Sequence, residues 1–142
     1  MEQSELDALL TELKKGGEAE QSSASVAGTV LSPTCLLIKI EGRAVGPKEA
    51  AVVFGQIRDL VEATDHHLIV DLQECRYLSS FVLGEFSRVI ADKREQGRKV
   101  CVIGANAMMR GLFEMTSLSQ FLVVCDSQEE ALQQIESASG AS

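Results

Sequence analysis

The sequence predicts a single α/β domain in which about four helices cover a mixed, mostly parallel sheet of about five strands. From residue 26 onward, short apolar runs typical of strands alternate with stretches in which apolar residues recur at helical spacing. The first two strand-like runs are separated only by Ser32, Pro33 and Thr34, which indicates a hairpin and therefore a mixed sheet. With 142 residues, the chain is long enough for one such domain and a modest tail.

The amino-terminal part is predicted to be separate from this domain. In residues 1–13 apolar side chains recur at the spacing of one helix face, which predicts a short amphipathic helix with its apolar face formed by Leu6, Leu9, Leu10 and Leu13. Residues 14–25 are rich in Gly, Ser and charged residues, so we expect a flexible linker. The domain then occupies residues 26–137, and residues 138–142 are expected to be a disordered tail.

Each element of the domain has its own local signal. Short apolar runs bounded by turn residues predict strands at residues 26–31, 35–41, 67–72, 99–103 and 121–125. Helical spacing predicts helices at residues 47–63, about 80–96, 107–115 and from about 128 to 137. Pro47 suits the first turn of the first of these helices, and Gly97 suits the end of the second. Either Asp126 or Ser127 can cap the last helix.

The segment from Leu68 to Gly84 carries the main functional signal. A buried strand ending at Asp71 leads to Ser79 and Ser80, which stand where the next helix begins. The free amide groups and the positive dipole end of a helix start favour an anion, so a phosphoserine is physically acceptable there. Serine is also among the commonest helix caps, and an unmodified cap is the alternative interpretation.

The net charge and the cysteine spacing argue against several classes of protein. Acidic residues exceed basic residues by 21 to 13, giving a net charge of −8 and arguing against binding to nucleic acid or an anionic membrane. The four cysteines are widely spaced, without the spacing of a metal site, and are expected to be reduced core residues. No signal peptide or run of membrane-spanning length is evident, so we expect a cytoplasmic protein.

No cluster of residues suited to catalysis, metal binding or a cofactor is evident in the sequence. His66 and His67 precede the central strand and are interpreted as a solvated junction. Cys75 lies beside Arg76, which could lower its pKa, but we interpret this thiol as structural. We therefore expect a binding or switching module rather than an enzyme. A small-ligand carrier that uses the turn at Gly104 is a third, weaker alternative.

The order of these elements resembles that of the STAS domain family, which includes anti-sigma factor antagonists. The resemblance is carried by VDLQECRYLSSFVLG and by KVCVIGANAMMRGLFEMTSLSQFLVV, and it spans about residues 26 to 136. It implies a phosphorylation site at Ser80, with Ser79 as the alternative, and a partner serine kinase of the anti-sigma type. The expected partner surface contains Ser79, Ser80, Phe81, Val82, Asn106, Met108 and Met109. Self-association into a homodimer is left open.

The sequence departs from the family motif at three positions. Ser79 replaces an aspartate, Phe81 replaces the second serine and Val82 replaces a glycine. Ser79 can still serve as a polar cap, whereas Phe81 and Val82 add bulk where the family surface is small and open. These substitutions make an unphosphorylated scaffold the alternative function.

A second resemblance concerns the amino-terminal helix. The segment SELDALL is similar to the opening peptide of flagellar motor switch proteins, which implies docking on a response regulator receiver domain through Leu6, Asp7, Leu9 and Leu10. A short helix on a linker suits folding upon binding. The scaffold alternative would accordingly belong to a flagellar or chemotaxis assembly.

Overall fold

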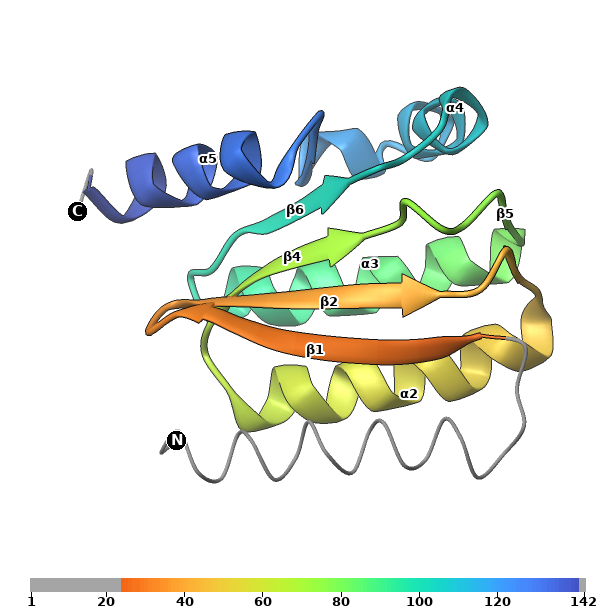
Figure 1. Ribbon diagram of the computed structural model, residues 1–142, viewed down its shortest axis with the longest axis horizontal. Helices are drawn as coiled ribbons and strands as arrows, with labels where there is room; N and C mark the ends of the chain where they lie inside the picture. The colour runs from red at the N-terminus through yellow and green to blue at the C-terminus, as the bar shows by residue number, and fades with distance from the viewer. Residues whose placement is uncertain (1–23, 141–142) are drawn as a thin grey trace.

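The computed structural model describes residues 24–140 and shows the predicted α/β fold (Figure 1). Its main sheet has five strands in the order β1-β2-β4-β6-β7. These strands are β1 (Ser25–Ser32), β2 (Cys35–Glu41), β4 (His67–Asp71), β6 (Val100–Ile103) and β7 (Leu122–Cys125). Only β1 is antiparallel to its neighbour, so the sheet is mixed and mostly parallel, as predicted.

The register of the strands separates two apolar faces. In β2 and β4 alternate residues point to opposite sides, so Ile38 and Val70 lie in the larger core while Ile69 and Cys35 lie in the smaller one. The central strand β4 is buried at all five positions, which explains its continuous apolar sequence. Each face must therefore be covered by helices.

Three helices cover the larger core, and one covers the smaller core. α2 (Pro47–Ala63), α3 (Ser80–Glu95) and α4 (Ala107–Met115) supply the larger core, and α5 (Gln128–Gly140) supplies Ala131 and Ile135 to the other. Phe86 of α3 joins the three helices, because its ring makes edge-on contacts with Phe54 of α2 at 5.0 Å and with Phe113 of α4 at 5.8 Å between centroids. α2 and α3 contact each other, and in Figure 1 α3 lies behind β2 and β4 while α2 lies below β1.

Several boundaries differ from the predictions. β1 begins at Ser25, inside the predicted linker, because Ser25 pairs with Glu41 and the preceding Ala24 is buried in the core. α5 continues to Gly140, three residues past its predicted end, since no proline interrupts the segment. The two-residue strands β3 (Ala44–Val45) and β5 (Tyr77–Leu78) and the 3-10 turn η1 (Leu118–Gln120) were not predicted. They are too short to show periodicity.

Candidate functional site

The start of α3 lies at the carboxyl-terminal edge of the parallel strands, where β5 leads into it (Figure 1). β3 and β5 form a separate parallel pair, in which Ala44 aligns with Tyr77 and Val45 with Leu78. The Ser79 amide extends this pairing by donating to the Val45 carbonyl at 3.0 Å. The small sheet therefore fixes the position of the two serines at the beginning of the helix.

The two serines have different environments. Ser79 is the N-cap of α3, but its side chain accepts no capping hydrogen bond and is only 6% exposed. Its Oγ has no hydrogen-bond partner among the described residues. Ser80 occupies the first position of the helix and is exposed. Only the Ser80 hydroxyl is therefore accessible to another protein in this conformation, and the expected role of the Ser79 hydroxyl as a cap is wrong.

The other members of the expected partner surface also divide by exposure. Phe81 and Met108 are 50% and 47% exposed, which suits contact with a partner. Val82 and Met109 are fully buried in the larger core, so they cannot contact a partner and their assignment to the expected partner surface is wrong. At helical spacing the chain turns these two side chains toward the sheet, while their sequence neighbours face outward. Tyr77 is 50% exposed and was missed, since it lies in the unpredicted strand β5.

Asn106 ties α4 to this region. Its Oδ1 accepts a hydrogen bond from the Met109 amide at 2.9 Å and thereby caps α4. Its Nδ2 donates to the Arg76 carbonyl, just before β5, at 3.1 Å. One side chain thus holds the first turn of α4 beside the segment that leads to Ser80.

The glycine turn after β6 lies against Gln73, in the loop that follows β4. Gly104 has a φ of +77°, and a Cβ added there would lie 2.7 Å from the Gln73 backbone nitrogen. Gln73 is held in place because its amide donates to Asp71 Oδ1 at 2.9 Å. This close approach and the positive φ account for the glycine at this position.

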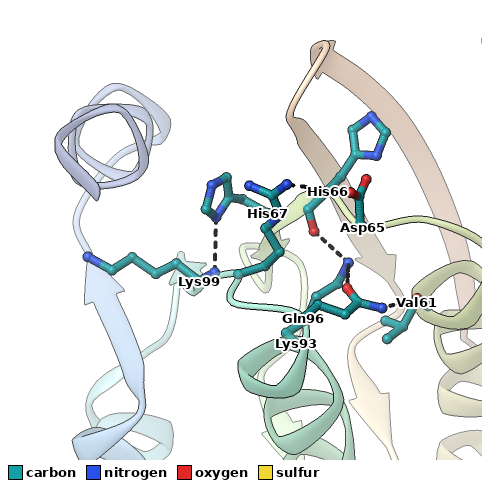
Figure 2. Close-up of polar contacts among 8 residues, drawn as sticks. Val61, Asp65, His66, His67, Lys93, Gln96 and Lys99 are labelled. Carbon is teal, nitrogen blue, oxygen red and sulfur yellow. Dashed lines mark hydrogen bonds and ion pairs between the residues drawn. The ribbon is translucent and has the colours of Figure 1, made fainter. Parts of the chain in front are cut away.

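The histidines lie at the opposite end of the sheet, where β4 and β6 begin. His67 is buried, and its Nδ1 accepts a hydrogen bond from the Lys99 amide at 3.0 Å (Figure 2). Burial lowers the pKa of both His66 and His67. The prediction of a solvated junction is therefore wrong for His67, whose imidazole fills a structural role.

A buried lysine, Lys93, lies at the same end of the molecule and forms a hydrogen-bond network there (Figure 2). The side chain of Lys93 from α3 is 1% exposed, and its Nζ donates to the His66 carbonyl and to Gln96 Oε1, the latter at 3.2 Å. Gln96 in turn donates from Nε2 to the Val61 carbonyl of α2 at 3.0 Å. Burial lowers the pKa of Lys93 to about 8. This network joins α2, α3 and the loop before β4.

The predicted docking residues Leu6, Asp7, Leu9 and Leu10 lie outside the described residues. Within residues 24–140, no three His, Cys, Asp or Glu side chains are grouped so that they could hold a metal ion. In the same range no helix is long and apolar enough to cross a membrane.

Comparisons of structure show proteins with the same fold. An anti-sigma factor antagonist from Mycobacterium paratuberculosis is 15% identical, with a TM-score of 0.70 over 80% of this chain and 95% of that chain. An anti-sigma-factor antagonist (STAS) domain protein from Planctomyces limnophilus is 12% identical, with a TM-score of 0.66 over 78% and 96%. The phosphorylated form of the Bacillus cell fate determinant SpoIIAA is 12% identical, with a TM-score of 0.61 over 78% and 99%.

Comparisons of sequence give the family. No curated protein sequence has a significant match to this chain. The model of the STAS domain family matches residues 31–131, which is more than half of the chain and includes every strand of the main sheet except β1, of which it covers only the end. The matched region contains the Ser79-Ser80 helix start and the Asn106 cap. The chain therefore belongs to the STAS domain family.

Proposed function

We propose that this chain is a non-enzymatic regulatory protein of the anti-sigma factor antagonist type. It binds a partner protein through the first turn of α3, and phosphorylation of Ser80 by a serine kinase controls that binding. The observation that carries the proposal is the contrast between Ser80, which is exposed, and Ser79, whose hydroxyl is buried. The helix start thus offers a kinase one accessible hydroxyl.

The start of α3 is also suited to a phosphate. The first turn contains no acidic residue, so no carboxylate competes for the positive end of the helix dipole. The Ser79 side chain makes no capping bond, so it does not compete with an anion for the amides of that turn, of which the Val82 amide donates to the Ser79 carbonyl at 3.0 Å. A phosphate adds nearly two negative charges and considerable bulk beside Phe81, and both changes oppose a packed protein interface. The SpoIIAA protein of similar fold is known in unphosphorylated and phosphorylated forms.

The environments of the thiols and imidazoles support a role without catalysis. Burial raises the pKa of Cys75 to about 11 and that of Cys101 to about 12, so both are protonated at neutral pH and poor nucleophiles. The Cys75 thiol contacts the Ile40 carbonyl, which fits the structural role expected from the sequence. The buried His67 accepts a backbone hydrogen bond and is not free to act as a base.

Incubation with ATP and any anti-sigma-type kinase that a neighbouring gene encodes should place one phosphate on Ser80. Peptide mass spectrometry would locate it, and Ser80→Ala should abolish labelling while Ser79→Ala, the matched control, leaves it. Labelling that persists in Ser80→Ala would contradict the assignment of the site. If the kinase binds the chain but labels neither serine, the protein is instead a constitutive scaffold.

A further inference from the structure

The surface around Ser80 combines exposed apolar side chains with unpaired positive charge. Tyr77, Phe81 and Met108 are each about half exposed, although such large side chains are usually more buried. They belong to β5, α3 and α4, and Figure 1 shows β5 and α4 at the same end of the molecule. The bond from Asn106 to the Arg76 carbonyl brings the start of α4 to the segment that carries Tyr77.

Two arginines lie together at this end. The Arg76 amide donates to the Arg43 carbonyl at 2.7 Å, and the Tyr77 amide donates to the same oxygen at 3.1 Å. Both arginine side chains are exposed, and within the described residues neither makes an ion pair. In contrast, Arg98 pairs with Asp65 and Arg110 pairs with Asp126. Arg43 and Arg76 directly precede the paired strands β3 and β5, so their like charges repel one another and an anionic group from another protein would relieve the repulsion.

We propose that these five residues, Arg43, Arg76, Tyr77, Phe81 and Met108, form one recognition surface for a protein whose binding face has an apolar centre and acidic residues at its rim. The aromatic rings and Met108 supply the desolvated contact, and the arginines select for carboxylates. This inference rests on the proposed function, because it names the chemistry of the partner that binds at Ser80.

The same surface gives phosphorylation a specific effect. The chain has a net charge of −8, so only local positive charge can attract an acidic partner. A phosphate on Ser80 would introduce negative charge at this surface, offset the arginines and repel the partner's carboxylates. The arginine pair is therefore the element whose charge the modification counteracts.

The test compares the association rate of the kinase with the wild-type chain, with Arg43→Glu/Arg76→Glu, and with Arg88→Glu as control. Arg88 is an exposed arginine in the middle of α3. At about 50 mM salt we expect the double variant to associate about tenfold more slowly, and the control to be unchanged. The difference should largely disappear at about 500 mM salt because the charges are screened. Circular dichroism would verify that all three chains are folded.

The outcomes separate this inference from the proposed function. Kinase binding with the same rate for the double variant would overturn the acidic-rim inference and leave the proposed function intact. A kinase that fails to bind the wild-type chain would overturn both. Faster association of the double variant would show that the partner face is basic, which also contradicts the inference.

Discussion

Replacing Phe86 with alanine is expected to lower the free energy of unfolding by about 3–5 kcal/mol. The ring is fully buried and lies between Phe54 and Phe113, so its loss leaves a cavity where α2, α3 and α4 meet. Rigid neighbouring helices can collapse only partly into that space, which adds a cavity cost to the lost burial. Urea unfolding monitored by circular dichroism would measure the change.

Phe81→Ala is the matched control, because it removes the same ring from a half-exposed position five residues earlier in the same helix. We expect it to cost less than about 1 kcal/mol of stability. It should nevertheless weaken partner binding, since Phe81 belongs to the proposed recognition surface. Equal destabilisation by the two substitutions would show that the start of α3 is packed differently.

The second large effect is a dependence of stability on pH caused by Lys93. Burial lowers its pKa from the ordinary 10.5 to about 8, with Asp65 opposing the change and Arg98 reinforcing it. Between these two values the unfolded chain binds a proton that the folded chain does not. The free energy of unfolding therefore rises by roughly 3 kcal/mol as the pH increases from about 8 to 10.5. Below pH 8 Lys93 is charged in the folded chain as well, and the full cost of burying the ammonium group lowers the stability.

Lys93→Met should remove this rise while keeping most of the apolar packing of the side chain. Unfolding free energies of the wild type and of Lys93→Met, measured from about pH 7 to 10.5, give the contribution of Lys93 as their difference. Lys48→Met, which changes an exposed lysine near the start of α2, should retain the wild-type profile. A Lys93→Met profile parallel to the wild type would contradict a depressed pKa.

The regular elements could be predicted from the sequence because each has a strong local signal. Pro47 at a first turn and Gly97 in the left-handed conformation mark helix boundaries that the structure places at or next to the predicted residues. The continuous apolar run of β4 likewise indicates a strand buried on both faces. These signals depend on neighbouring residues, so one sequence is enough to detect them.

The finer features of the site depend on contacts between distant segments. Arg43 and Arg76 are 33 positions apart in the sequence and meet only through the two-residue strands β3 and β5, which have no detectable periodicity. Lysine side chains are usually exposed, so the residue type predicts a surface position for Lys93. In the structure Lys93 is buried and donates hydrogen bonds to the His66 carbonyl and to Gln96. Phe81 and Val82 belong to one apolar run of the sequence, and only the packing of α3 on the sheet shows that Val82 is buried while Phe81 is half exposed.

The affinity of the partner kinase for the chain with and without phosphate on Ser80 tests the central claim most directly. Isothermal titration calorimetry would compare unmodified protein, protein with phosphoserine incorporated at position 80, and Ser80→Ala, which keeps the surface uncharged. We expect the phosphate to weaken binding at least about a hundredfold, because charge and bulk both act at a packed interface, and Ser80→Ala to bind like the unmodified chain. Equal affinity of the phosphorylated and unmodified chains for the kinase would contradict the account.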